Sequence, residues 1–266
     1  MTLGAMPRLQ LTGFNNLTKT LCLNSYDVGY ASTPAQQKRY LAYIDETYNT
    51  ERLTKILSTV AGIIGGNILN IARQDYEPQG ASVALLISEG SSAAPASGLA
   101  SEPPGPWPDA LLCHLDKSHI TIHTYPESQP NQGISVFRAD IDVSTCGRIS
   151  PLKALDYLID CFKPDIASID YRVRGFTRDD IGNKHFIDHP IHSIQDFLSQ
   201  DASVHYQMID INLAQQQIFY TRMLRKDSDL RHYQFGPAEQ DAPFHDQSGI
   251  ERRVRQEMTE IFYGEN

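Results

Sequence analysis

Two stretches early in the chain carry the hydrophobic spacing of helices. Large apolar residues recur every three or four positions from Pro34 to Tyr48 and again from Glu51 to about Ile64. That spacing gathers them on one side of a helix, where they can bury against a core. Gly65 and Gly66 follow the second stretch and end it, because glycine is a poor helix former. The pattern predicts two helices, each with one buried face.

Extended segments come next, in two pairs. The first pair covers Asn67 to Gln74 and Ala81 to Ser88, joined by a turn whose Pro78 and Gly80 suit a reversal of direction. The second pair covers Ser118 to Tyr125 and Ile134 to Val143, joined by a loop of Pro, Asn, Gln and Gly that permits an antiparallel return. Both pairs are predicted to form β-hairpins.

The second half of the chain continues to alternate helix and strand patterns. Ser150 and Pro151 suit a helix start, as cap and first residue. Further elements are predicted as follows: a helix with Leu152, Leu155, Ile159 and Phe162 inward, a strand over Ile166 to Val173, a short helix over Ile191 to Leu198, a strand over Val204 to Leu213, and an amphipathic helix over Ile250 to Phe262. Because hairpins predominate, we expect an α/β protein of the α+β type, with a mostly antiparallel sheet covered by helices in a sandwich-like arrangement.

One segment lacks any such pattern. Residues 89–108 are rich in Ser, Ala, Gly and Pro and contain only two large apolar residues, Leu99 and Trp107. Such a composition cannot bury enough apolar surface to offset the cost of ordering the chain. We expect an exposed, mobile loop here, within a single domain that spans residues 1–266.

Composition narrows the classes of function. The 266 residues carry 32 acidic against 23 basic side chains, a formal charge of −9, so the clustered Lys and Arg of a nucleic-acid-binding protein are not expected. The N-terminus shows no secretory signal, and the most apolar window is too short to span a bilayer. Four cysteines without a CxxC pair indicate free thiols in a cytoplasmic protein.

The most informative motif is the run Lys117-Ser118-His119-Ile120-Thr121-Ile122-His123-Thr124-Tyr125-Pro126-Glu127, with Thr145-Cys146-Gly147 further on. It resembles the self-cleavage and catalytic segment of the S-adenosylmethionine decarboxylase proenzymes. The resemblance is to the longer, Gram-negative bacterial form and includes residues 13–18 and 170–178. It therefore extends over nearly the whole chain.

The resemblance implies that the chain cuts itself between Lys117 and Ser118. In that family the serine hydroxyl attacks the preceding carbonyl, and the resulting ester is converted into a pyruvoyl group at the new N-terminus. Decarboxylation needs such a carbonyl, which forms a Schiff base with the substrate amine and accepts electrons; no pyridoxal-phosphate motif is present to supply one. His123 matches the family residue that abstracts a proton during processing. Cys146 matches the residue that protonates the substrate carbon.

Plain strand geometry conflicts with this constellation at two points. Ser118 and His123 are five residues apart, so a regular strand would point them to opposite faces. A bulge, or a strand that begins only after Ser118, would be needed. A symmetric hairpin would also pair Ser118 near Asp142 and leave Cys146 about four residues, or ~13 Å, beyond it. We therefore expect curvature or a bulge to close the site.

Other residues carry weaker indications. Tyr76 matches an aromatic position near the adenine in shorter family members, and Phe14 has a similar character; for both, core packing is an equally good interpretation. Glu127 binds substrate or simply solvates a loop. Arg172 and Arg174 alternate as on one strand face and suit a polar interface.

A metal site is a further possibility that the residues do not favour. The histidines at 185, 189 and 192 with Asp188 resemble ligands, yet Pro190 disfavours a shared helix, and no protein-bound transition metal is expected. Members of this family branch are often stimulated by Mg²⁺, which prefers oxygen ligands.

The leading hypothesis is a self-processing decarboxylase that acts on S-adenosyl-L-methionine for spermidine biosynthesis. The same chemistry would suit ornithine or arginine on the same scaffold. A catalytically dead regulatory paralogue is a third possibility, although it need not keep Ser118, His123 and Cys146 together. The resemblance also implies a homo-oligomer of processed two-chain protomers, dimeric or tetrameric.

Overall fold

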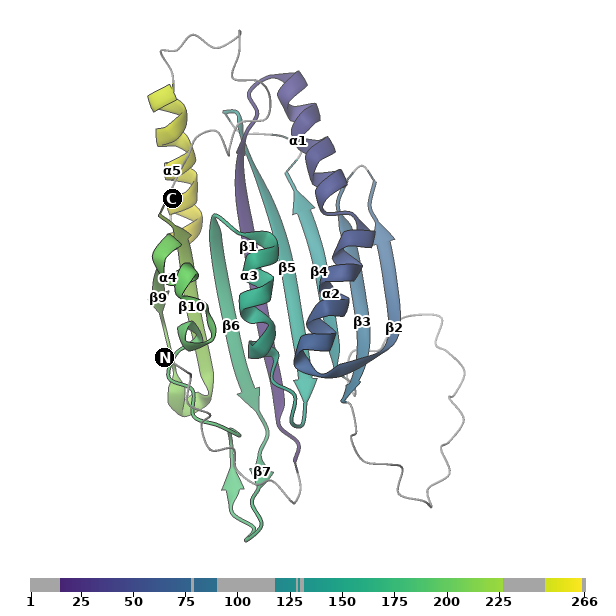
Figure 1. The fold of residues 1–266 in the computed structure, drawn as a ribbon. Helices are drawn as coiled ribbons and strands as arrows, with labels where there is room; N and C mark the ends of the chain where they lie inside the picture. The colour runs from purple at the N-terminus through teal and green to yellow at the C-terminus, as the bar shows by residue number, and fades with distance from the viewer. Residues whose placement is uncertain are drawn as a thin grey trace.

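One sheet of eight antiparallel strands organises the chain, in the order β2-β3-β4-β5-β1-β6-β10-β9 (Figure 1). The computed structural model describes residues 15–77, 79–89, 118–127, 129, 132–226 and 247–264. Phe14, Lys117 and the loop expected to be mobile, apart from Glu89, lie outside these ranges. The strands are β1 (Thr18–Tyr30), β2 (Gly66–Asp75), β3 (Ala81–Glu89), β4 (His119–Pro126), β5 (Ile134–Cys146), β6 (Ile166–Arg174), β9 (Tyr206–Asp210) and β10 (Ile218–Arg225), with a separate small hairpin of β7 (Thr177–Arg178) and β8 (Lys184–His185).

Four of the five helices in the described ranges follow the predicted hydrophobic pattern. The five helices are α1 (Pro34–Thr47), α2 (Thr50–Ile64), α3 (Leu155–Phe162), α4 (Gln200–His205) and α5 (Gln247–Tyr263), with 3-10 turns η1 (Pro151–Ala154), η2 (Ile194–Phe197) and η3 (Ala214–Gln216). Local chemistry sets their ends. Thr33 and Gln36 form a capping box at the start of α1, and Gly65 ends α2 at a φ of 85°. No helix in the described ranges is long and apolar enough to cross a membrane.

Several predictions of the second half of the chain were imprecise. The predicted helix over Ile191 to Leu198 is only the four-residue turn η2, and the first residues of the predicted strand over Val204 to Leu213 belong to α4. Two strands of the main sheet, β1 and β10, were missed, as were the short strands β7 and β8. The strand β1 is central, yet it buries Lys19 and Ser25 on its core-facing side, so its polar–apolar alternation is disguised.

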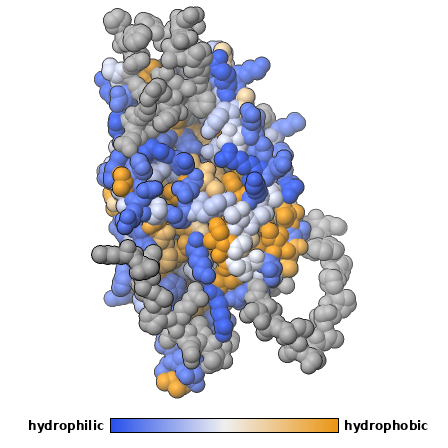
Figure 2. Space-filling model, viewed as in Figure 1, coloured by the Kyte–Doolittle hydropathy of each residue, from blue (hydrophilic) through white to orange (hydrophobic). Residues whose placement is uncertain are grey.

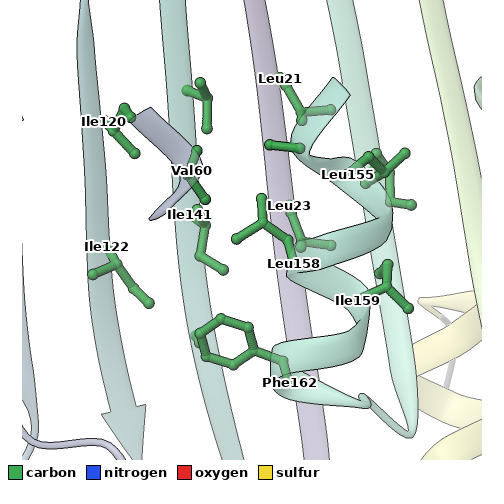
Figure 3. Packing of buried hydrophobic residues seen from close by; sticks show 14 of the residues in the cluster. Leu21, Leu23, Val60, Ile120, Ile122, Ile141, Leu155, Leu158, Ile159 and Phe162 are labelled. Atoms are coloured by element: carbon green, nitrogen blue, oxygen red, sulfur yellow. The ribbon is translucent and has the colours of Figure 1, made fainter. Parts of the chain in front are cut away.

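The main core lies between the sheet and the helices α1, α2 and α3, which all cover one face (Figure 1). Strand residues and helix residues point toward each other there (Figure 3), including Leu21, Leu23, Ile120, Ile122 and Ile141 of the sheet and Val60, Leu155, Leu158, Ile159 and Phe162 of the helices. The outer side of this helix layer carries many hydrophilic side chains, with apolar ones between them (Figure 2). Burial of this apolar set is the main stabilising term of the fold.

The opposite face of the sheet is covered differently along its length. A second cluster forms where α5 packs Val254, Met258 and Phe262 against Val28 and Ile166. These strand residues alternate with those of the main core, so α5 lies on the other face. At the far end of the same face the strands carry polar side chains, which we call the open face: His119, Thr121 and His123; Asp140, Asp142, Ser144 and Cys146; Thr18, Thr20, Cys22 and Asn24; Ser168, Asp170, Arg172 and Arg174.

An acid pair lies near the end of β1 that α5 covers. The Val28 amide donates to Asp165 Oδ2 at 2.9 Å, and Arg225 Nε lies 3.2 Å from Asp165 Oδ1. Burial raises the pKa of the Asp27 carboxyl well above its usual range, and the Asp165 carboxylate raises it further, against the opposing charge of Arg225. The folded state therefore favours protonated Asp27.

Replacing this carboxyl should stabilise the protein in a pH-dependent way. In the unfolded chain Asp27 ionises near pH 4, so keeping it protonated in the fold costs more free energy as the pH rises from there toward the raised pKa. We expect Asp27→Asn to raise Tm, by about 2–4 °C for each 1 kcal/mol regained, and the gain should grow from pH 4 to pH 8. Thermal unfolding followed by circular dichroism measures this. Asp180→Asn, at an exposed position, is the control, and a gain that is flat with pH would contradict the account.

Candidate active site

Ser118 lies directly before β4, between the ends of β3 and β5. The Ile87 amide of β3 donates to the Ser118 carbonyl oxygen at 2.8 Å, and the Cys146 amide of β5 donates to Ser118 Oγ at 3.1 Å. The serine is only 7% exposed. A backbone donor therefore holds its hydroxyl oxygen in place.

The predicted pairing of the hairpin was wrong by three residues, and the difference assembles the site. His119 pairs with Ser144, which places Ser118 opposite Thr145 and next to Cys146. The strand β4 ends at Pro126, opposite Phe137, and the first residues of β5 extend past it to pair with β1. Because β5 begins before the residue opposite the end of β4, the register itself places Cys146 beside Ser118. The expected bulge is not needed.

Cys146 is the last residue of β5 and is exposed, with a free thiol. Gly147 follows at a φ of 71°, a conformation that glycine adopts without strain, and its amide donates to the Leu17 carbonyl at 3.0 Å. Thr145, on the other side, is fully buried and donates to the Ile149 carbonyl at 3.2 Å. The thiol is thus presented by a turn that is tied down on both sides.

A buried charge lies behind this turn and was missed by sequence reasoning. Lys19, opposite Thr145, is fully buried; its Nζ donates to the Ile149 carbonyl and pairs with Asp188, whose other oxygen lies 2.8 Å from His189 Nδ1. Burial alone would raise the pKa of Asp188, but the His189 hydrogen bond and the Lys19 charge outweigh it and lower the pKa to about 2. Breaking a buried pair of this kind costs about 3–5 kcal/mol, so Lys19 anchors the floor of the site.

His123 lies elsewhere on the strand. Directly opposite residues share a face, so the pairs His119–Ser144 and His123–Asp140 place His123 and Cys146 on the same open face. The strand β4 begins only after Ser118, which is one of the two alternatives given above. The side chains nevertheless continue to alternate through Ser118, and the five residues from Ser118 to His123 span about 16 Å. The structure therefore brings Ser118 and Cys146 together and leaves His123 of the same chain apart from both.

Two weaker candidates lie toward the His123 end of β4. Tyr76 is 37% exposed and donates its hydroxyl to Ser82 Oγ at 2.9 Å; Ser82 is the residue paired with His123. Glu127 is exposed and accepts from the Val136 amide at 2.9 Å, which gives its carboxylate a role in the loop. Neither packs in the core.

Carboxylates dominate the middle of the open face. Burial raises the pKa of the Cys22 thiol, and a hydrogen bond and charge from Asp142 and the charge of Asp170 raise it further. Burial also raises the pKa of Asp170, despite the opposing charge of Arg172. Arg172 and Arg174 are both exposed on this face, as their alternation predicted. The face thus carries both signs of charge, which are partly desolvated.

Two of the histidines that resemble metal ligands in the sequence have separate partners. His185 Nε2 lies 2.9 Å from Asp179 Oδ2 in the small hairpin, whereas His189 belongs to the Lys19–Asp188 network. Within the described ranges, no group of three or more His, Cys, Asp or Glu side chains is arranged to hold a metal ion.

Comparison with known proteins identifies the family. The family model described as S-adenosylmethionine decarboxylase matches residues 44–175. Proteins named S-adenosylmethionine decarboxylase proenzyme are similar along nearly the whole chain: 58% identical in Halorhodospira halophila, over 97% of this chain and 96% of that protein; 58% in Azotobacter vinelandii, over 97% and 98%; and 55% in Desulfitobacterium hafniense, over 100% and 99%. With this identity over nearly its full length, the chain belongs to the S-adenosylmethionine decarboxylase family.

Proposed function

We propose that this chain is a proenzyme that cleaves itself between Lys117 and Ser118 and then converts S-adenosyl-L-methionine to decarboxylated S-adenosylmethionine, the aminopropyl donor for spermidine biosynthesis. Membership of the family supports the reaction. The structural observation that carries the assignment of residues is the buried Ser118 hydroxyl, which accepts from the Cys146 amide at 3.1 Å. This hydrogen bond places Ser118, the proposed cleavage point, beside Cys146, the proposed proton donor.

Maturation begins with the Ser118 hydroxyl. Its oxygen attacks the Lys117 carbonyl carbon, the peptide C–N bond breaks, and the chain is joined by an ester with a free amine on residue 118. A base then removes the α-proton of residue 118, the Cβ–Oγ bond breaks, and Lys117 leaves as a carboxylate. Water adds to the resulting enamine after tautomerisation and ammonia departs, which leaves the pyruvoyl group. Burial of Ser118 protects the ester from hydrolysis.

The pyruvoyl carbonyl supplies the electron sink for loss of carbon dioxide. Ser118 fits this purpose because it directly precedes a strand that is fixed on both sides by backbone hydrogen bonds. Cys146 then delivers a proton to the carbon that has lost the carboxyl group. The Cys146 backbone lies next to residue 118, and its exposed thiol belongs to the open face. A reduced thiol also favours action in the cytoplasm.

His123 serves maturation from a second protomer in this proposal. Its separation from Ser118 within one chain, about 16 Å, excludes direct proton transfer between them in the described structure. It shares the open face with Cys146, and that face carries Asp140, Asp142, Arg172 and Arg174. A two-fold pairing of open faces would bring the His123 end of one chain to the Ser118 end of the other. Tyr76 and Glu127 would then approach the substrate from the partner, while Phe14 stays a prediction.

Mg²⁺ is proposed as an activator only. The carboxylates of the open face are the ligand type that Mg²⁺ prefers, and no step of the reaction above passes through the ion.

Single substitutions should separate cleavage from turnover. We expect Ser118→Ala to abolish both, because it removes the nucleophile and the source of the pyruvoyl. Cys146→Ala keeps the backbone amide that holds Ser118 Oγ and should cleave at a rate near that of the wild type, while decarboxylation falls by about 10²–10⁴-fold. Intact mass under denaturing conditions should show a fragment ending at Lys117 and one beginning at residue 118 that is lighter than its serine form by one ammonia.

Assays with S-adenosylmethionine, ornithine and arginine complete this test. Faster release of carbon dioxide from ornithine or arginine than from S-adenosylmethionine would make that amino acid the substrate instead. Efficient turnover by Cys146→Ala would remove the proton-donor role, and a wild-type chain that stays whole would contradict self-cleavage.

Mixed protomers test the placement of His123. A His123→Ala chain alone should stall before cleavage. When it is produced together with a differently tagged Ser118→Ala chain, about half of it should be cleaved, because random two-fold pairing gives each His123→Ala chain an intact histidine in half of the pairs. Denaturing gels that separate the two tags measure this. No cleavage in the mixture, with the two chains shown to co-purify, would assign His123 to its own chain.

A further inference from the structure

Glu89, the last residue of β3, makes a contact across the sheet that the reaction scheme above does not use. Its Oε1 accepts from the Arg148 amide at 2.6 Å. A Cβ atom placed on Gly147 would lie 2.5 Å from Glu89 Oε2, so the carboxylate rests against the backbone of the turn that follows Cys146. The side chain itself is exposed.

The contact between Glu89 and Arg148 lies close to Ser118 in the sheet. In the sheet order, β4 lies between β3 and β5. Ile87 of β3 donates to Ser118, and Glu89 lies two residues further along, beyond the start of β4. Neighbouring strands are about 4.7–4.9 Å apart, so β3 and β5 are roughly 10 Å apart at this level. The Glu89 side chain and the Arg148 backbone amide meet across that gap, close to residue 118.

The turn that Glu89 contacts carries the Cys146 thiol and the backbone amide that orients Ser118 Oγ. Residues 146 to 148 follow one another directly. The Gly147 amide is tied to Leu17 on the β1 side, so Glu89 supplies the matching restraint from the β3 side. Cleavage between 117 and 118 breaks the bond just before β4, and the hydrogen bond between Glu89 and Arg148 does not depend on that bond.

We propose that Glu89 is a positioning residue, which holds the Cys146–Arg148 turn in place over residue 118 before and after self-cleavage. The proposal rests on the proposed function for the roles of Ser118 and Cys146. It requires only a hydrogen-bond acceptor at Oε1, since the donor is a backbone amide. The glutamine variant should therefore preserve the function and the alanine variant should not.

The test compares Glu89→Ala, Glu89→Gln and the matched control Glu46→Ala, which removes an exposed carboxylate from α1. We expect Glu89→Ala to slow cleavage at least about 10-fold and to lower kcat of the matured enzyme with KM little changed, because loss of positioning acts on the reacting geometry. Glu89→Gln and Glu46→Ala should stay within about 2-fold of the wild type on the same grounds. Hydrogen exchange of the backbone amides at 147 and 148 should accelerate in Glu89→Ala alone.

A double-substitution cycle sharpens the result. Gly147→Ala drives a methyl group into the carboxylate and also strains the backbone at its φ of 71°, so it disrupts the contact that Glu89→Ala removes. The combined variant should therefore be no slower than the slower single variant, which is the non-additivity of residues that act together.

The outcomes distinguish this proposal from the function on which it rests. Wild-type cleavage with an equally fast Glu89→Ala and unchanged amide exchange would overturn the role of Glu89 alone. Glu89→Gln as slow as Glu89→Ala would also overturn it, by showing that the charge rather than the acceptor is needed. A wild-type chain that is never cut at residue 118 would contradict the proposed function instead. Should Glu89→Ala not fold, Glu89→Asp, one methylene too short for the bridge, takes its place.

Discussion

The register of β4 against β5 is the constraint on which the candidate site depends. Because His119 pairs with Ser144, the residue before β4 falls beside the last residues of β5, and the Cys146 amide reaches Ser118 Oγ. In an antiparallel sheet, a slip of one residue would turn every side chain to the other face. The apolar side chains of Ile120, Ile122 and Ile141 resist such a slip, since each is fully buried beneath the helices. Hydrophobic packing thus fixes the geometry of a polar site at the strand end.

The ends of the strands near Cys146 are held together by polar contacts. Lys19 is fully buried there, and its charge is compensated by Asp188 and the Ile149 carbonyl. A buried ion pair contributes little net stability compared with apolar packing, but separating its members is costly. It therefore holds the segment before η1 and the segment around residue 188 in one arrangement. Glu89 on the other side of Cys146 has the same character, because it ties strand ends together through a polar contact.

The two faces of the sheet divide the tasks of the molecule. One face is given to stability, with the core under α1, α2 and α3 (Figure 1). The other face is covered by α5 at one end and carries polar and charged residues at the other. Burial raises the pKa values of Cys22 and Asp170 on that face, so its polar groups are already partly desolvated. A face of this kind suits contact with a second polar surface, which agrees with a site shared between protomers.

The sequence by itself determined most of the helices, the two hairpins without the register of the second, and the candidate residues of the site. Helices α1, α2 and α5 and strands β2, β3 and β6 follow from local hydrophobic spacing and from caps such as Thr33 and Gly65, and Ser118 and Cys146 follow from a contiguous motif. Only the tertiary structure decided the register, the central place of β1 and the burial of Lys19. Each of these depends on partners distant in sequence: β1 pairs with β5 and β6, and Lys19 pairs with a residue 169 positions away. Local patterns carry no information on such pairings, because hydrogen bonds between strands and buried charges are satisfied by whichever segment the whole fold brings near.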